Sequence, residues 1–288
     1  MHPVRHTAVL VSLLCTSLSV QADEVRIDDG ERILNANLEL ASGRTIEDGV
    51  ILMLHGTLGH KDMEIMVLLQ SVFQEYGYSS LAINLSFDIE DRHGFYPCER
   101  PHTHEYNDAL AELELWVRWL QEQSVGDIVM LGHSRGANQI ANYLLQDEHT
   151  IVAGILLAPS TGSRATTEIV QSNLVKATQE GWLNDTGFLH CQGARVSATS
   201  YASYYASRSL ANTPELLREI STPVLVLSGS EDSTVPGLAT QMEHVNNDLV
   251  QHLQIDGADH FFRDLFAYDV IEAAINFLTS VQPAVSPE

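Results

Sequence analysis

The sequence predicts an α/β protein, with a mostly parallel, doubly wound sheet of about eight strands and helices on both faces. Two patterns predict this class. Short apolar runs, typical of strands buried on both faces, alternate along the chain with segments whose apolar residues recur every three or four positions, as in amphipathic helices. Strands separated by helices pair in parallel, and the helices then cover both faces of the sheet.

The first half of the chain begins with an antiparallel edge and then alternates between strands and helices. Residues 25–27 and 33–40 are expected to form two short strands around a turn at residues 28–30. Further strands are predicted at residues 50–54, 78–85 and 128–131, and helices at residues 62–76, 104–123 and 137–145. The parallel strands therefore deliver their following loops to one edge of the sheet.

The second half resumes the alternation after one interruption. A strand over residues 151–158 ends at Pro159, and residues 160–213 are polar with helical patches, which predicts a small, mainly helical lid insertion. The remaining strands are expected at residues 223–229 and 249–255, and the remaining helices at residues 237–246 and 262–281. The chain is thus predicted to form a single domain over residues 23–281, followed by a flexible tail at residues 282–288.

The N-terminal segment, residues 1–22, has the pattern of a secretory signal peptide. Arg5 and His6 precede an apolar stretch over residues 8–14, and Ala22 precedes two acidic residues. The apolar stretch is too short for a stable membrane span, and an N-terminal membrane anchor is the alternative. We therefore expect cleavage after about Ala22, export to the periplasm or the medium, and no stable membrane insertion after cleavage.

The composition is strongly acidic, because 38 Asp and Glu residues against 15 Lys and Arg residues give a formal net charge of −23 in a chain of 288 residues. A surface of this charge repels the phosphates of nucleic acids and the headgroups of anionic membranes. The sequence therefore predicts no nucleic-acid partner.

One apolar run stops abruptly at the pentapeptide Gly132-His133-Ser134-Arg135-Gly136, between a predicted strand and a predicted helix. The two glycines lack the Cβ atoms that would collide in so tight a bend, and the serine hydroxyl is then exposed on a strained turn. An ordinary turn is the alternative, since Gly and Ser are common turn residues. Other loops at the same edge of the sheet distinguish a nucleophilic serine from an ordinary turn.

Those loops carry an acid and a histidine. The stretch from Gly229 to Pro236 contains Asp232, and the stretch from Gly257 to Phe261 contains His260. With His55 and Gly56 after an earlier strand, the chain resembles the α/β-hydrolase family, in particular its esterase, lipase and serine aminopeptidase branch, in the order nucleophile, acid, histidine. The resemblance covers residues 25–281.

The resemblance implies a role for each matching residue. Ser134 would be the nucleophile, His260 the base that takes its proton, and Asp232 the group that orients the imidazole. The family places the oxyanion hole at the amide after the nucleophile, here Arg135, and in the loop after an early strand, here Thr57. Alternatives remain at two positions. Glu231 or Asp259 could replace Asp232 as the acid, and His260 could be a packed structural histidine.

Residues around the elbow are predicted to bind or shape the substrate. His55 is expected to brace the oxyanion loop and His133 to fill space behind the serine, and both are included in the set expected to line the substrate site: His55, Gly56, Tyr96, His102 and His133. The charged side chain of Arg135 at the mouth of the pocket disfavours a long-chain lipid and favours a polar or anionic acyl group.

Two cysteines remain in the predicted exported chain, Cys98 and Cys191. In an oxidising compartment a disulfide is plausible, and it would join two pocket-lining loops. Unpaired thiols are one alternative. Another is a metal site with His102 and His104, but thiolate and imidazole sites have tighter recurrent spacing, so we expect neither a metal nor a cofactor.

The sequence therefore predicts a serine hydrolase that cleaves an ester or related acyl bond of a small molecule through an acyl-serine intermediate. A peptidase or a thioesterase would use the same three residues. A non-catalytic hydrolase fold that binds a ligand is the alternative from another class, since fold alone does not establish function.

Overall fold

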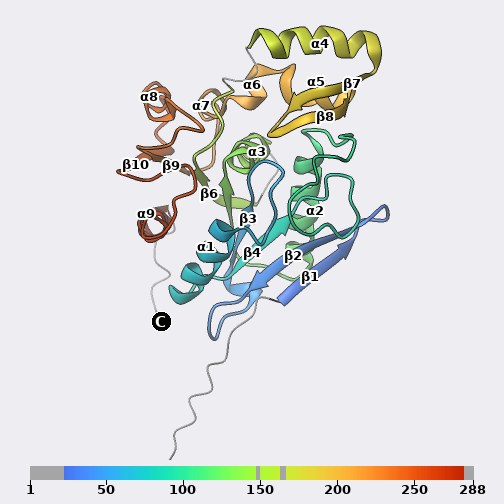
Figure 1. Ribbon diagram of the computed structural model, residues 1–288. Helices are drawn as coiled ribbons and strands as arrows, with labels where there is room; N and C mark the ends of the chain where they lie inside the picture. Colours follow the sequence, from blue (N-terminus) through green and yellow to red (C-terminus); the bar gives the residue numbers. More distant parts are fainter. Residues whose placement is uncertain (1–22, 147–149, 163–166, 282–288) are drawn as a thin grey trace, which may run out of the picture.

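The computed structural model describes residues 23–146, 150–162 and 167–281. The predicted signal peptide and the predicted tail lie outside the described residues. Figure 1 shows a twisted sheet with helices on both sides and a separate group of elements above one end of it. The predicted α/β class is confirmed.

Eight strands form the main sheet in the order β1-β2-β4-β3-β5-β6-β9-β10. Strand β2 pairs antiparallel with both β1 and β4, and the other neighbours pair in parallel. The strands are β1 (Asp23–Asp28), β2 (Ile33–Glu39), β3 (Val50–Leu54), β4 (Ser80–Asn84), β5 (Ile128–His133), β6 (Ile151–Leu157), β9 (Val224–Gly229) and β10 (Val250–Ile255). The predicted strands thus all occur, with ends that differ by one or two residues in most cases.

Two apolar cores lie on the two faces of this sheet. Successive side chains of a strand point to opposite faces, so residues of β3 belong to the two cores alternately. Ile51 and Met53 belong to one core, and Leu52 and Leu54 belong to the other. Helices α1 (Glu64–Glu75) and α9 (Phe266–Val281) cover the first face, and α2 (Asp108–Glu122) and α3 (Arg135–Leu144) cover the second. A short 3-10 helix, η1 (Ile46–Asp48), precedes β3.

The lid lies between β6 and β9 and differs in part from its prediction. It contains α4 (Glu168–Glu180), α5 (Ala198–Tyr205), α6 (Arg208–Ala211) and α7 (Thr213–Leu216), but also an antiparallel hairpin of β7 (Trp182–Phe188) and β8 (Cys191–Ser197). Asn, Asp and Gly in β7 are poor strand formers. Tertiary packing rather than strand propensity therefore stabilises the hairpin. Phe188 is buried against the rings of three tyrosines, Tyr201, Tyr204 and Tyr205.

Two helices near the C-terminus begin or end away from their predicted positions. Helix α8 (Leu238–Met242) is shorter than expected, and α9 begins at Phe266 rather than at residue 262. Phe262 and Asp264 have positive φ angles of 47° and 56°, which no helix accommodates. The segment before α9 is therefore a loop, and this loop carries His260.

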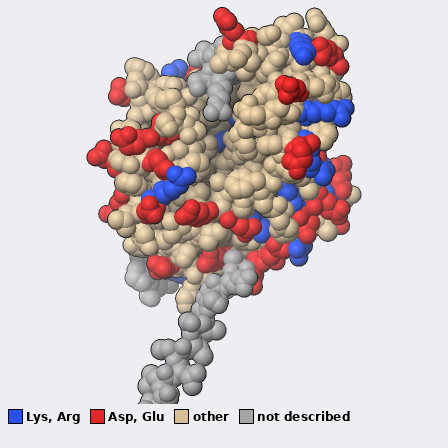
Figure 2. All heavy atoms as spheres, viewed as in Figure 1, with Lys and Arg blue, Asp and Glu red and all other residues tan. Residues whose placement is uncertain are grey.

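The surface carries the acidic excess that the composition predicts. Figure 2 shows acidic side chains along the two sides and the lower part of the face in view, with fewer basic ones among them, whereas the centre of this face is mostly uncharged. Within the described residues, no helix combines the length and the apolar character that crossing a membrane requires.

Candidate active site

Ser134 occupies a strained turn between β5 and α3. Its φ of 55° and ψ of −118° lie outside the favoured regions for a residue with a side chain, and such strain costs about 1–3 kcal/mol. A Cβ on Gly132 would lie 2.6 Å from Cα of Ala137, so only glycine fits there. The Ser134 amide donates a hydrogen bond of 2.8 Å to the carbonyl of Leu157, which anchors the turn to β6.

The structure brings Ser134, His260 and Asp232 together as one hydrogen-bonded chain. Nε2 of His260 lies 3.0 Å from Oγ of Ser134, and Nδ1 lies 2.8 Å from Oδ2 of Asp232. The other carboxylate oxygen of Asp232 accepts hydrogen bonds from the amides of Thr234 and Val235, at 2.7 and 2.9 Å. Burial acts to raise the pKa of Asp232, but the bonds from His260 and these amides hold it below its usual value.

The two alternative acids are arranged differently. The carboxylate of Asp259 accepts a hydrogen bond of 2.7 Å from Arg263 and another of 2.9 Å from the Phe261 amide, and Glu231 is exposed. His260 itself is buried, with 5 % of its surface exposed. Among the described acids, Asp232 is therefore the one that bonds to the imidazole.

The backbone amides of Thr57 and Arg135 lie beside Ser134. Both residues line the same cavities as the serine, and in the described part of the chain neither amide donates a hydrogen bond. Arg135 is also the first residue of α3, where the amides of a helix carry a partial positive charge. Two backbone donors without a described acceptor therefore belong to residues that line the cavities at the serine.

His55 braces the loop that carries Thr57. Its Nδ1 lies 2.8 Å from the carbonyl oxygen of Gly56, and its Nε2 accepts a hydrogen bond of 3.2 Å from the amide of Leu85. Because the Gly56 carbonyl can only accept and the Leu85 amide can only donate, the ring proton lies on Nδ1. Burial, aided by the charge of Arg92, lowers the pKa of His55 to about 3, so the ring is neutral at ordinary pH. His55 is fully buried and does not line the cavities at Ser134.

Two cavities meet at Ser134. The larger, of about 330 Å³, is lined by His260 and by several apolar side chains, including Met63, Phe95, Leu189 and Phe261. The smaller, of about 80 Å³, has a more polar lining that comes from the lid and from the loop after β6. Thr57, Ser134, Arg135 and Thr234 line both. A third cavity of about 380 Å³ shares Met63, Phe95 and Phe261 with the larger one and adjoins it.

The residues predicted to bind substrate divide into two groups. Gly56 and His133 line the larger cavity, whereas His55, Tyr96 and His102 line neither cavity at the serine. His133 is buried, and its Nε2 lies 2.9 Å from the carbonyl oxygen of His260, so it supports the loop that carries the imidazole. Burial lowers the pKa of His133 to about 4.

Tyr96 and His102 are packing residues because the loop that carries them folds under the lid hairpin. Their ring centroids lie 4.7 Å apart, and the Tyr96 hydroxyl donates to the carbonyl of Pro101. The His102 amide bonds to the carbonyl of Arg195 in β8. Side chains that the sequence analysis did not select line the cavities instead, among them Phe95, His190, Tyr204 and Thr161. Tyr204 belongs to a group of tyrosines over residues 201–205, and that group is the sequence signal that could have indicated it.

A disulfide joins Cys98 to Cys191, with 5.4 Å between their Cα atoms. It links the loop after β4 to the first residue of β8. The segments that contribute Phe95 and His190 to the larger cavity are therefore covalently joined. His190 lies beside the pair, but the two sulfur atoms are bonded to each other, and thiolate ligands for a metal are therefore absent at this cluster of described residues.

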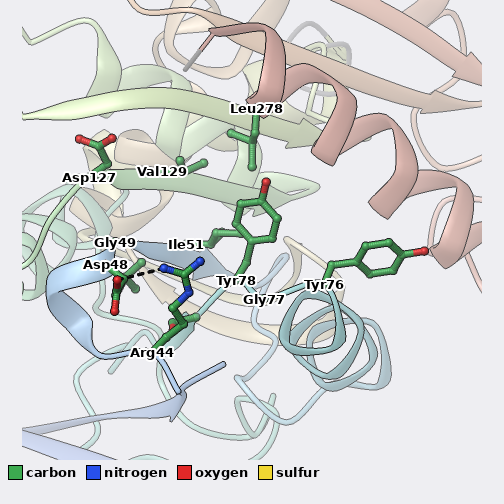
Figure 3. Close-up of a pocket in the computed structure, with 12 residues that line it drawn as sticks. Arg44, Asp48, Gly49, Ile51, Tyr76, Gly77, Tyr78, Asp127, Val129 and Leu278 are labelled. Atoms are coloured by element: carbon green, nitrogen blue, oxygen red, sulfur yellow. Dashed lines mark hydrogen bonds and ion pairs between the residues drawn. The ribbon is translucent and has the colours of Figure 1, made fainter. Parts of the chain in front are cut away.

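A cavity of about 260 Å³ lies at the opposite end of β3 and β5 (Figure 3). Arg44 and Asp48 form an ion pair of 3.1 Å there, beside the ring of Tyr78. None of the described residues that line it is a histidine. Because sites in such sheets form at the carboxyl ends of the strands, the cavities at Ser134 are the better candidates.

A mostly parallel sheet, a strained serine after its central strand and an acid and histidine from later strand ends define the class of α/β hydrolases. The model of the alpha/beta hydrolase family matches residues 51–266, and the chain belongs to this family. The predicted resemblance is thereby confirmed, and the chain is a hydrolase by class.

Solved structures with the same fold are distant in sequence. Est1E from Butyrivibrio proteoclasticus with bound ferulic acid has a TM-score of 0.69 at 20% identity, over 88% of this chain and 99% of Est1E. The α/β hydrolase GrgF from Penicillium sp. sh18 has a TM-score of 0.69 at 18% identity, over 90% and 98%. The monoacylglycerol lipase of Paleococcus ferrophilus has a TM-score of 0.63 at 18% identity, over 86% and 99%. No curated protein matches the sequence.

Proposed function

We propose that the protein is a serine hydrolase that cleaves a carboxylic ester or related acyl bond of a small molecule through an acyl-serine intermediate. One observation carries the proposal: the hydrogen-bonded chain of Asp232, His260 and Ser134 ends on a strained elbow that opens into two cavities. A strained backbone at a buried polar chain is typical of a site under functional constraint. A fold used only for binding has no need of this arrangement.

The reaction follows from the positions of the atoms. Oγ of Ser134 attacks the carbonyl carbon while Nε2 of His260 takes the hydroxyl proton, and Asp232 stabilises the imidazolium that forms. The amides of Thr57 and Arg135 bind the oxyanion of the tetrahedral intermediate. Collapse of this intermediate breaks the bond to the leaving group, which receives the proton from His260. Water then repeats the sequence on the acyl-serine and releases the acid.

The same groups would cleave a thioester or an activated amide, so the bond type is a separate question. A panel of ester, thioester and anilide substrates with one acyl group and matched leaving groups distinguishes an esterase from a thioesterase or a peptidase. We expect the ester to give the highest kcat/KM.

Labelling by a fluorophosphonate probe tests the proposal directly. We expect the wild-type protein to be labelled and to hydrolyse a short p-nitrophenyl ester. Ser134→Ala should lose the label and lose at least about 10⁴-fold in kcat, with an unchanged thermal unfolding midpoint. Ser280→Ala, which removes an exposed hydroxyl at the end of α9, is the matched control and should behave as wild type. Labelling that persists in Ser134→Ala would overturn the assignment.

We also propose that the protein is exported. The pattern of residues 1–22 supports export, and so does a disulfide between Cys98 and Cys191, which persists in an oxidising compartment. Alkaline phosphatase fused to the C-terminus folds into its active form only after export. Activity of the fusion should therefore depend on residues 2–22, and equal activity without them would contradict export.

A further inference from the structure

The guanidinium of Arg135 is held at the active site without a carboxylate partner. Its Nε donates a hydrogen bond of 3.2 Å to Oγ1 of Thr57, and its Cζ lies 5.3 Å from the centre of the Tyr204 ring. Within the described ranges, no Asp or Glu oxygen lies within ion-pair distance of it. Because Arg135 lines both cavities, the site presents a positive charge that the protein itself leaves uncompensated.

A buried chain of side chains fixes the ring on which this guanidinium rests. The Tyr204 hydroxyl lies 2.9 Å from Nδ1 of His104, and Nε2 of His104 lies 3.2 Å from Nδ1 of His102. All three residues are buried. Burial lowers the pKa of His104 to about 3 and that of His102 to about 4, so neither ring adds charge at neutral pH. The Arg135 guanidinium, which comes from α3, therefore packs on a lid ring whose position is fixed by buried side chains.

The smaller cavity offers a second polar group that lacks a partner. Thr161 is 4 % exposed, and its Oγ1 is buried without a hydrogen bond to any described residue. Thr161 lines the smaller cavity together with Arg135 and Ser160. A buried hydroxyl without a partner is unfavourable, and rotation of the Thr161 side chain towards an acceptor bound in the cavity would remove that cost. A cation and an unpartnered donor around one small cavity favour an anionic ligand group.

The position of His260 decides which end of a substrate enters this cavity. The imidazole must protonate the leaving group, and it lines only the larger cavity. The leaving group therefore lies among Met63, Phe95, Leu189 and Phe261, in apolar surroundings. The acyl group enters the smaller cavity, whose volume of about 80 Å³ accommodates only a short chain.

We propose that the acyl group carries a carboxylate bound by Arg135 and Thr161, so that the substrate is a monoester of a short dicarboxylic acid with a bulky apolar alcohol. This inference rests on the proposed hydrolase function and specifies its substrate class. The anionic group has to be recognised locally, because the net charge of −23 repels anions at long range.

Two esters of 2-naphthol with acyl groups of nearly equal size test the inference. One carries the hemisuccinyl group, which has a terminal carboxylate, and the other the 4-methylpentanoyl group, in which two methyl groups replace the carboxylate oxygens. The rate without enzyme is subtracted for each ester, and the readout is the ratio of kcat/KM for the charged ester to that for the neutral one. The ratio cancels general damage to the site.

We expect the wild-type ratio to exceed about 10, since a hydrogen bond to a charged group changes affinity about 10- to 100-fold. Arg135→Met should lower the ratio about 30-fold or more, and Arg135→Lys, which keeps the charge, should retain part of it. Thr161→Val should lower it about fivefold. Arg118→Met is the matched control, because it removes an exposed arginine on α2 that is paired with Glu114.

The outcomes separate the two proposals. A wild-type ratio near 1, or a ratio that Arg135→Met leaves unchanged while the neutral ester is hydrolysed, overturns the carboxylate inference alone. Absence of turnover with both esters, together with absence of fluorophosphonate labelling, overturns the hydrolase function and the inference with it. If Arg118→Met lowers the ratio as much as Arg135→Met does, the effect comes from the net charge of the protein, and the inference is also overturned.

Discussion

Nη2 of Arg92 donates a hydrogen bond of 2.8 Å to the carbonyl oxygen of Gly59, across the boundary between the loop after β4 and the loop that carries Thr57. The same guanidinium donates to the Leu85 carbonyl at 2.6 Å, to Oδ1 of Asn84 at 2.8 Å and to the Gly94 carbonyl. Arg92 is 3 % exposed, and burial lowers its pKa to about 10 although the charge of Glu112 opposes this shift. One side chain therefore ties the loop that carries Thr57 to the end of β4.

Arg92→Met should destabilise the protein by about 3 kcal/mol or more, because it leaves several buried acceptors without a donor. Urea unfolding measures the effect. Arg118→Met, which removes an exposed arginine from α2, is the control and should stay within about 0.5 kcal/mol of wild type. A loss below 1 kcal/mol in Arg92→Met would show that the network contributes little.

The elbow glycines permit a second prediction. A Cβ on Gly136 would lie 2.7 Å from the carbonyl oxygen of Leu54, which is backbone of the central sheet and cannot move aside. Gly136→Ala should therefore destabilise the fold by about 3 kcal/mol or more, or prevent soluble expression. Gly187→Ala is the control, since its Cβ would meet only Oε1 of Gln192, at 3.9 Å. Equal stability of the two variants would contradict the tight packing of the elbow.

The sheet and the Ser134, Asp232 and His260 cluster were predictable because local patterns encode them. Buried parallel strands read as continuous apolar runs, and their carboxyl ends meet at one edge of the sheet. Residues at those ends, far apart in sequence, are therefore expected to meet. The observed distances of 2.8 and 3.0 Å within the cluster fulfil that expectation.

The cavity walls were not predictable from the same patterns. Tyr96 and His102 were expected to face the substrate because they follow a strand next to the elbow. Instead the lid hairpin covers His102, and Tyr96 is buried against the rings of His102 and His104. The hairpin depends on contacts of Phe188 with tyrosines in α5 rather than on the propensity of its own residues. Such long-range packing leaves no periodic signal in the sequence.

The disulfide between Cys98 and Cys191 closes a loop with a sequence separation of 93 residues. Loops of this length lose much chain entropy on closure, so we expect the double variant Cys98→Ser and Cys191→Ser to be less stable by about 2–5 kcal/mol. Urea unfolding of the variant and of wild type, with and without reductant, measures this. Reductant should lower the stability of wild type only. An equal response of both proteins would argue against the bond.

Four buried histidines predict a steep loss of stability in acid. Burial lowers the pKa of His55 and His104 to about 3 and that of His102 and His133 to about 4, whereas unfolded histidine has a pKa of about 6.5. A lowered pKa in the folded state means that the unfolded chain binds more protons between these values. Stability is therefore present above pH 6.5 and is lost as the pH falls towards 4.

Glu112 offsets part of this proton uptake, because it releases about one proton when the protein unfolds near pH 5.5. Burial raises its pKa to about 7, so near pH 5.5 the folded state holds a proton that the unfolded state has released. The net uptake on unfolding near pH 5.5 should be about three protons, each worth about 1.4 kcal/mol per pH unit. Urea unfolding from pH 7 to pH 5 measures the slope. His104→Gln should reduce it by about one proton, and a flat profile would contradict the prediction.

The two acids that neighbour His260, Asp232 in space and Asp259 in sequence, provide the last prediction. Asp232→Asn keeps an oxygen for the amides of Thr234 and Val235 but replaces the carboxylate that faces Nδ1 of His260. We expect kcat to fall about 10³- to 10⁴-fold with little change in KM, because the imidazolium loses its counter-charge and its fixed tautomer. Asp259→Asn removes the same charge one residue before His260 but breaks only an exposed pair with Arg263, so it should retain activity within about threefold. A large loss in Asp259→Asn with activity retained in Asp232→Asn would reverse the assignment of the acid.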